Sequence, residues 1–145
     1  MITYVAEDIF ESKCQTLVNP VNCMGIMGNG LALEFKKRFP ACEAPYKAAC
    51  DKNLLKPGML MIYRWKTHWV LQFPTKIKWW NESCLPYIED GLKKFAATYK
   101  QQGITSAAFP MLGCGYGNLD PEDVKVLLRK YLEPLDIPCE VCIGK

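Results

Sequence analysis

The sequence is poor in the residues that build metal sites and in long apolar segments. It has one histidine, His68, and one cysteine pair at metal-like spacing, Cys139 and Cys142, with no second pair. Because a structural zinc site takes about four ligands, we expect no bound metal. The N-terminal residues 1–10 have no basic segment, and no apolar run reaches membrane-spanning length. We therefore expect no signal peptide, no membrane contact and a cytoplasmic location, where the eight cysteines are buried free thiols.

Two common phosphate-binding motifs are also missing. Gly25, Gly28 and Gly30 are spaced G-x-x-G-x-G, whereas a dinucleotide-binding unit has G-x-G-x-x-G. No G-K-[ST] follows them, which excludes the P-loop that binds nucleoside triphosphates. We expect no cofactor.

Length and charge set the broad class of the protein. The 145 residues suit one domain, residues 1–145, that can bury a sizeable core. Half of the residues are apolar and 23% are charged, which is ordinary globular composition. The formal net charge of +3 permits contact with nucleic acid without arguing for it.

Strand-like and helix-like segments alternate along the chain. Strands are expected at 2–5, 15–18, 59–64, 69–73, 106–109 and 139–143, with the third and fourth forming a hairpin. Helices are expected at 31–39, 46–52, 83–101 and from residue 121 onward, where Asp120 can cap the N-terminus. This alternation predicts an α/β fold with a mixed sheet between helices, whose ligands lie beyond the carboxyl ends of the strands.

The segment from residue 16 to residue 39 predicts an anion site. Residues 16–18 end a buried strand that we expect to break at Asn19 and Pro20, and Asn22 follows just after it. A glycine loop and a helix come next. Glycine lets main-chain N–H groups approach a ligand closely, and a helix N-terminus adds unpaired donors with a partial positive charge. A phosphate group suits this arrangement.

A second glycine loop, residues 111–118, follows the strand that ends near Pro110. Two such loops at one edge of the sheet can grip a pyrophosphate from both sides. Tyr116 can cover a sugar ring or simply pack on the surface. Asp8, at the end of the first strand, can accept a hydrogen bond from an exocyclic amine or remain a solvated carboxylate.

These motifs together resemble one family across essentially the whole chain. Asp8-Ile9, V-N-P-V-N at 18–22, G-N-G-L-A at 28–32 and G-C-G-Y-G at 113–117 are similar to the macrodomain, an ADP-ribose-binding fold. The stretch 18–40 and F-P-T-K at 73–76 look closest to the branch that contains the DNA ADP-ribosyl glycohydrolase antitoxins and the terminal ADP-ribose glycohydrolases. The resemblance implies a macrodomain-like three-layer α/β/α sandwich with a central mixed sheet.

The resemblance also implies roles for individual residues. Lys76 matches the lysine that this branch uses for chemistry, and Asn22 would act beside it on the distal ribose. Asp8 and the Ile9 main chain would hold adenine. The expected ADP-ribose-binding residues are Asp8, Ile9, Asn19, Asn22, Gly28, Asn29, Gly30, Leu31, Gly113, Cys114, Gly115, Tyr116 and Gly117.

The chain departs from the family pattern in two places. In the relatives that release ADP-ribose from glutamate, an acidic residue occupies the second loop where this chain has Gly117, and the nearest carboxylate here is Asp120. The family often places an aromatic residue on adenine near the last strand, whereas this chain ends with Cys142, Ile143 and Gly144 before Lys145. The first departure favours a DNA-directed activity.

The resemblance therefore implies an ADP-ribosyl hydrolase whose substrate is thymidine-linked ADP-ribose on DNA. A hydrolase of protein-linked ADP-ribose, O-acetyl-ADP-ribose or ADP-ribose-1″-phosphate is the alternative, as is a non-catalytic ADP-ribose reader. Lys78, Trp79 and Trp80 interleave aromatic and basic side chains, which suits single-stranded DNA, although such residues can equally be core and surface packing. We expect a monomer.

Overall fold

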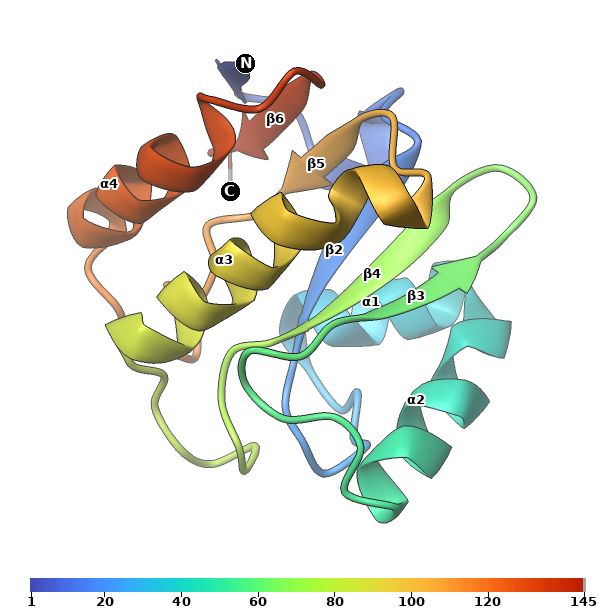
Figure 1. Cartoon of the computed structure of the whole chain (residues 1–145). Coiled ribbons are helices and arrows are strands. Elements are labelled where there is room, and N and C mark those ends of the chain that lie inside the picture. Colours follow the sequence, from blue (N-terminus) through green and yellow to red (C-terminus); the bar gives the residue numbers. More distant parts are fainter. Residues whose placement is uncertain (145) are drawn as a thin grey trace.

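The computed structural model describes residues 1–144, which form a six-stranded mixed sheet between two pairs of helices (Figure 1). The strands lie in the order β1-β6-β5-β2-β4-β3, and only β3 runs antiparallel to its neighbour β4. The strands are β1 (Ile2–Val5), β2 (Thr16–Val21), β3 (Met61–Arg64), β4 (Trp69–Pro74), β5 (Ala107–Phe109) and β6 (Cys139–Cys142). The helices are α1 (Gly30–Arg38), α2 (Glu43–Asp51), α3 (Leu85–Gln102) and α4 (Pro121–Leu132), with 3₁₀ turns at Ile9–Glu11 and Pro40–Cys42. The predicted three-layer α/β/α sandwich and the β3–β4 hairpin are confirmed.

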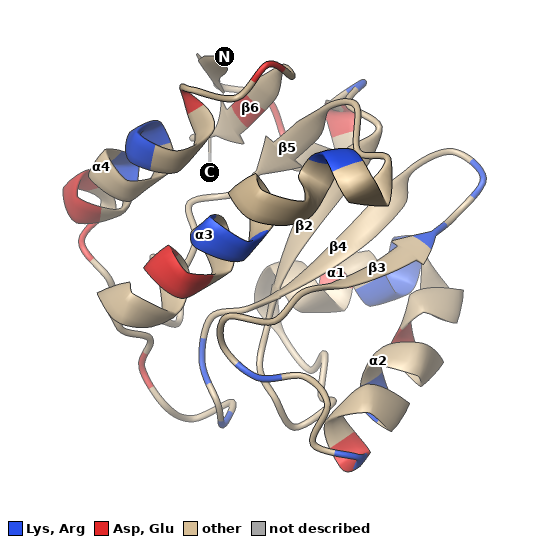
Figure 2. Ribbon diagram, in the orientation of Figure 1, with Lys and Arg blue, Asp and Glu red and all other residues tan. Residues whose placement is uncertain are grey.

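Each face of the sheet is covered by one pair of helices. The core under α3 and α4 contains Leu92, Phe95 and Leu128, and the core under α1 and α2 contains Phe35 and Tyr46; all five are fully buried. In Figure 2 the strands β2, β4 and β5 carry no charged residue, while Lys, Arg, Asp and Glu lie along the helices, the loops and the strands β3 and β6. Central strands covered on both faces are expected to be apolar throughout.

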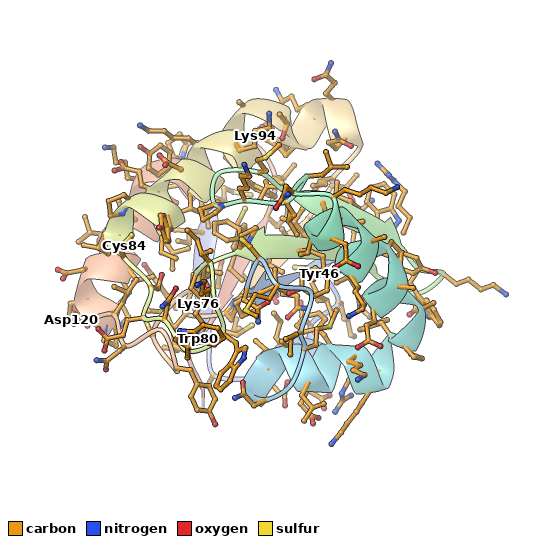
Figure 3. All side chains as sticks on the ribbon, turned by 90° about the horizontal axis from the view of Figure 1, so that it is seen from below. Tyr46, Lys76, Trp80, Cys84, Lys94 and Asp120 are labelled. Atoms are coloured by element: carbon orange, nitrogen blue, oxygen red, sulfur yellow. The ribbon has the colours of Figure 1, made fainter. Side chains whose placement is uncertain are left out.

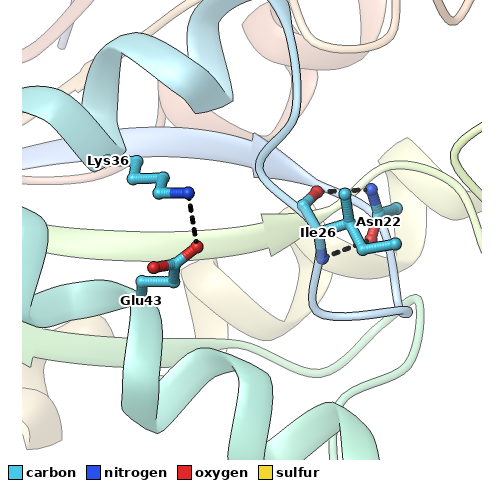
Figure 4. A network of polar contacts seen from close by, with 4 residues as sticks. All are labelled: Asn22, Ile26, Lys36 and Glu43. Atoms are coloured by element: carbon cyan, nitrogen blue, oxygen red, sulfur yellow. Dashed lines mark hydrogen bonds and ion pairs between the residues drawn. The ribbon is translucent and has the colours of Figure 1, made fainter.

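The helix ends follow ordinary capping rules. The Asp120 side chain accepts a hydrogen bond from the N–H of Glu122 at 2.9 Å, as the sequence predicts, and Pro121 occupies the first turn of α4. Gly103 ends α3 in the left-handed conformation, with φ of 83°. An ion pair of 3.0 Å between Lys36 and Glu43 joins α1 to the start of α2 (Figure 4).

Strand β2 is longer than predicted, because Asn19 and Pro20 continue it to Val21. The Val21 carbonyl accepts a bond from the N–H of Thr75, so Val21 faces β4, and its neighbour Pro20 faces the other side. On that side β5 has already ended at Phe109. Within residues 1–144 no strand lies opposite Pro20 on this side, so the missing N–H of proline costs the sheet no hydrogen bond.

The neighbouring strands β2 and β5 are followed by helices on opposite faces of the sheet. After β2 it enters α1 on one face, and after β5 it enters α4 on the other. Such a reversal opens a crevice beyond the carboxyl ends of the two strands. The two glycine loops connect these strands to these helices, so the topology places both at that crevice.

Candidate ligand-binding and active site

A cavity of about 620 Å³ lies beyond the carboxyl ends of β6, β5, β2 and β4. Its wall is formed by residues 20–22, 28–32, 75–76, 110–111, 113–117 and 142–143, together with Ile26 and Trp79. Both glycine loops and Lys76 thus line one cavity. A volume of this size is in the range of small-molecule and cofactor sites.

The first glycine loop presents the N-terminus of α1 to the cavity. Gly30 has φ of 58°, a left-handed conformation that favours glycine. The preceding residue, Asn29, makes no side-chain cap, and the first intrahelical bond runs from the N–H of Leu33 to the Asn29 carbonyl at 3.2 Å. Within residues 1–144 the N–H groups of residues 30–32 therefore have no protein acceptor, and they lie at a positive helix end, where an anion is stabilised.

The second glycine loop is folded tightly on itself. Gly113 has φ of 74°, and its carbonyl accepts the N–H of Leu119 at 2.8 Å. A Cβ on Gly117 would lie 2.5 Å from the same carbonyl oxygen, so only glycine fits there without movement of the main chain. Among residues 1–144, the N–H groups of Gly115, Tyr116 and Gly117 donate to no protein acceptor. Three consecutive free donors of this kind can bind a second anionic group.

The two loops meet at the mouth of the cavity through Tyr116. Its ring lies 3.1 Å from the position that a Cβ on Gly30 would take, yet 69% of the residue is exposed. Tyr116 is therefore a cover over the cavity mouth and not a packed core residue. A side chain at position 30 would push this cover away.

Asn22 holds the segment that follows β2 (Figure 4). Its Oδ1 accepts the N–H groups of Met24 and Ile26 at 2.9 and 3.4 Å, and its Nδ2 donates to the Ile26 carbonyl at 2.8 Å. The fully buried Tyr46 on α2 points its hydroxyl at the Asn22 carbonyl and Oδ1, at 2.8 and 2.9 Å. The second Nδ2 hydrogen of Asn22 is not used by these bonds. Tyr46 carries no sequence signal for this role, because the contact joins elements far apart in the chain.

We expect Tyr46→Phe to loosen this segment. Burial raises the pKa of Tyr46 far above the ordinary range, so the phenol stays a neutral donor. Removing its hydroxyl takes a buried partner from Asn22 and should reduce the free energy of unfolding by about 1–3 kcal/mol. Hydrogen exchange should become faster at the amides of Met24 and Ile26.

Tyr99→Phe is the matched control for this prediction. It removes one hydroxyl that bonds to Asp136 at 2.6 Å, on the opposite face of the sheet. Chemical denaturation and hydrogen exchange of both variants separate local from global effects. Unchanged protection of Met24 and Ile26 in Tyr46→Phe would contradict the proposed role of the phenol.

Lys76 follows β4 and lines the same cavity (Figure 3). Its carbonyl accepts a bond from the thiol of Cys23 at 3.5 Å, and the next carbonyl, of Ile77, accepts the Cys23 N–H at 2.8 Å. Partial burial lowers the pKa of the Lys76 amine below its ordinary value. Within the described part of the chain it has no ion-pair partner. A lysine in this state can act as an acid, a base or a nucleophile.

One expected ligand contact, Asn19, lies outside the wall of the cavity. Asn19 lies within β2, is fully buried and points toward the core under α1 and α2, where its Nδ2 donates to Gln72 Oε1 at 2.8 Å. The strand continues three residues further than the sequence suggested, which keeps Asn19 away from the cavity. Asn19 Oδ1 and Gln72 Nε2 remain buried without a hydrogen bond among residues 1–144.

Asp8 and Ile9 lie outside the wall of the cavity. Asp8 Oδ1 caps the first 3₁₀ turn by accepting the N–H of Phe10 at 3.0 Å, and Ile9 is part of the core. Burial raises the pKa of the wall residue Cys142 to about 12, with a small contribution from the charge of Asp8. Asp8 follows β1, which pairs with β6 up to Val5 opposite Cys142, so it lies near the β6 end of the cavity; its contact with adenine stays a prediction.

The other expected residues do come together. Asn22, Gly28, Asn29, Gly30, Leu31 and Gly113 to Gly117 all line the cavity with Lys76. Sequence reasoning missed Thr75, Cys142 and Ile143 as wall residues; each simply follows or ends a strand at this edge of the sheet. Asp120 is outside the wall, and Figure 3 places it at the periphery, away from Lys76.

The described residues contain no cluster of three or more histidine, cysteine or acidic side chains that could hold a metal ion. All eight cysteines are free thiols. None of the helices in residues 1–144 is long and apolar enough to cross a membrane.

Comparison with known proteins gives consistent matches. The Macro domain family model matches residues 18–128. A DNA ADP-ribosyl transferase-DNA ADP-ribosyl glycohydrolase fusion protein of Thermosipho africanus is 36% identical over 159 residues, covering 97% of this chain and 41% of its own length. The DNA ADP-ribosyl glycohydrolase of Mycobacterium tuberculosis is 38% identical over 140 residues, covering 93% of this chain and 40% of its own length. The chain spans about two fifths of these curated relatives.

Solved structures agree with this fold. Thermosipho africanus DarTG in complex with ADP-ribose has a TM-score of 0.93 at 37% identity, over 97% of this chain and 41% of that chain. The macrodomain of Mycobacterium tuberculosis DarG has a TM-score of 0.94 at 35% identity, over 98% of this chain and 97% of that chain. With the family model matching 18–128 and the sheet order and loops described above, this chain belongs to the macrodomain family.

Proposed function

We propose that this chain binds ADP-ribose and, as an ADP-ribosyl glycohydrolase, removes it from modified DNA, with thymidine as the modified nucleoside. The observation that carries the proposal is the meeting of two sets of free main-chain donors and Lys76 in one cavity of about 620 Å³. A diphosphate matches the two donor sets. The curated relatives named as DNA ADP-ribosyl glycohydrolases support the reaction and the substrate.

The order of strands supports one orientation of the ligand. Cavity residues come in turn from β6, β5, β2 and β4. The loops after β5 and β2 would hold the two phosphates, so adenine would lie at the β6 end, toward Asp8 and Ile9. The distal ribose would then lie at the β4 end, where Asn22 and Lys76 line the wall.

The chemistry follows from this placement. Breaking the bond between the base and the anomeric carbon leaves positive charge on the ribose and negative charge on the base. As an ammonium, Lys76 would donate a proton to the departing base while water adds to the anomeric carbon. As a free amine, it would displace the base from the anomeric carbon; ring opening would give a Schiff base, which water would hydrolyse to release ADP-ribose. Asn22 would fix the ribose through its unused Nδ2 hydrogen.

Gly117 supports the DNA linkage over the glutamate ester. Its Cβ position is blocked at 2.5 Å by the Gly113 carbonyl, so position 117 has no room for an acidic side chain in this conformation. Asp120 is occupied as the cap of α4 and lies outside the wall. Among residues 1–144 no carboxylate lines the cavity to pair with Lys76, and the proposed chemistry rests on the lysine alone.

The direct test is a comparison of two substrates. The protein is incubated with a single-stranded oligonucleotide carrying ADP-ribosylated thymidine and, separately, with glutamate-ADP-ribosylated protein. We expect release of ADP-ribose from the oligonucleotide alone. Release from the protein alone would replace the proposed linkage, and release from neither, with ADP-ribose bound in calorimetry, would make the chain a reader.

We further propose that residues 1–145 act as one macrodomain and a monomer of 16.5 kDa in the cytoplasm, in the manner of an antitoxin. Light scattering gives the mass of the particle. Relief of toxicity in cells that express a DNA ADP-ribosyl transferase tests the antitoxin role.

A further inference from the structure

Two exposed tryptophans lie beside the cavity on the connection between β4 and α3. Trp79 and Trp80 are 49% and 55% exposed. Their rings meet edge to face, with centroids 5.3 Å apart and planes at 89°. Exposed aromatic residues that gather at one place usually mark a binding surface.

The segment that carries these rings is held in place. The N–H of Asn81 bonds to the Lys78 carbonyl at 3.0 Å, and the Asn81 side chain accepts the N–H of Lys78 at 3.2 Å. The N–H of Ser83 bonds to the carbonyl of Gly117 at 2.9 Å, and the hydroxyl of Ser83 bonds to Thr75. The tryptophans are therefore presented from an ordered turn that is attached to the second glycine loop.

The two tryptophans differ in their relation to the cavity. Trp79 is part of the wall that also contains Lys76, whereas Trp80 lies outside the wall. Trp80 is four residues beyond Lys76 on the same connection, and Figure 3 labels both. The Lys78 ammonium lies 5.3 Å from the Trp80 ring centroid, and within the described residues it has no carboxylate partner. The half-exposed Trp80 ring, with the Lys78 ammonium over it, therefore extends the surface outward from the β4 end of the cavity.

We propose that Trp80 and Lys78 bind the unpaired nucleotides next to the modified one, a role that rests on the proposed function. A base stacks on the Trp80 face, and Lys78 contacts the adjacent phosphate. Aromatic faces with basic side chains are the usual means of holding single strands. Bases in a duplex are stacked on their neighbours and cannot use such a face, so the partner is single-stranded.

The test compares a short with a long substrate. One is ADP-ribosylated thymidine as a free nucleoside, and the other carries the same nucleoside in the middle of a single-stranded oligonucleotide. We expect Trp80→Ala to lower kcat/KM for the oligonucleotide by about 5- to 100-fold and to leave the nucleoside value unchanged. Trp80→Phe, which keeps a ring, should restore most of the loss, and Trp80→Leu should not.

Lys78→Ala and Lys66→Ala form a matched pair of charge changes. Lys66 lies in the β3–β4 turn at the opposite end of the sheet. We expect Lys78→Ala to reduce the slope of log kcat/KM against log salt by about 0.7 for the oligonucleotide, the value of one phosphate contact on a single strand. Lys66→Ala should leave the slope unchanged.

Binding of an unmodified single-stranded oligonucleotide, measured by fluorescence anisotropy, separates this proposal from the proposed function. Loss of affinity in Trp80→Ala supports the surface even if no substrate is cleaved. Equal losses on nucleoside and oligonucleotide would overturn it, as would equal affinities of the parent and Trp80→Ala for the oligonucleotide. Full activity of Trp80→Leu would show a general apolar surface, of the kind that suits a protein, and would also overturn it.

Discussion

Replacing Lys76 by alanine is expected to lower turnover of the modified oligonucleotide by roughly 10²–10⁴-fold, the range of positioned acid or base catalysis. Affinity for ADP-ribose should stay close to that of the parent, since in the proposed binding mode main-chain donors of the two glycine loops, and not Lys76, hold the phosphates. Single-turnover kinetics and calorimetry measure the two quantities. Turnover like that of the parent would refute a catalytic role.

Two measurements separate the acid and the nucleophilic roles of Lys76. Borohydride reduces a Schiff base, so a covalent adduct at Lys76 supports attack by the free amine, while activity without an adduct supports proton donation. The rate depends on pH in opposite directions for the two roles. A nucleophile gains rate as pH rises through the pKa of Lys76, and an acid loses it. Because burial lowers this pKa, the change should fall below the ordinary lysine range.

Replacing Gly117 by alanine is expected to weaken ADP-ribose binding by roughly 10- to 100-fold. The new Cβ would lie 2.5 Å from the Gly113 carbonyl oxygen, which is main chain and cannot rotate away, so the loop has to open. Opening it removes charge-assisted bonds from main-chain N–H groups to phosphate, each worth about 1.5–3 kcal/mol. Calorimetry with ADP-ribose measures the loss.

Gly115→Ala is the control within the same loop. A Cβ on Gly115 meets no protein atom within 4 Å, so the loop keeps its conformation. The unfolding temperature of Gly115→Ala should equal that of the parent, whereas the unfolding temperature of Gly117→Ala should be lower. Equal ADP-ribose affinity in Gly117→Ala and the parent would show that the tight form of this loop is not needed for binding.

The sequence predicts the layers and both loops because their signals are local. Glycine spacing, Asp120 before Pro121 and alternating strands and helices depend on neighbouring residues. Asn19 was misplaced because proline usually ends a strand, and only the short β5 explains why Pro20 is tolerated. Tyr46 could not be found, since its bond to Asn22 joins a helix and a loop 24 residues apart.

Ser83 has a consequence for attempts to exchange specificity between family members. One residue bonds to the carbonyl of Gly117 in the second glycine loop and to that of Thr75 beside Lys76. If the second loop alone were replaced, Ser83 would have to bond to a main chain of different shape. Its movement would shift Thr75 and displace Lys76. An exchange of specificity should therefore replace residues 75–83 together with residues 113–117.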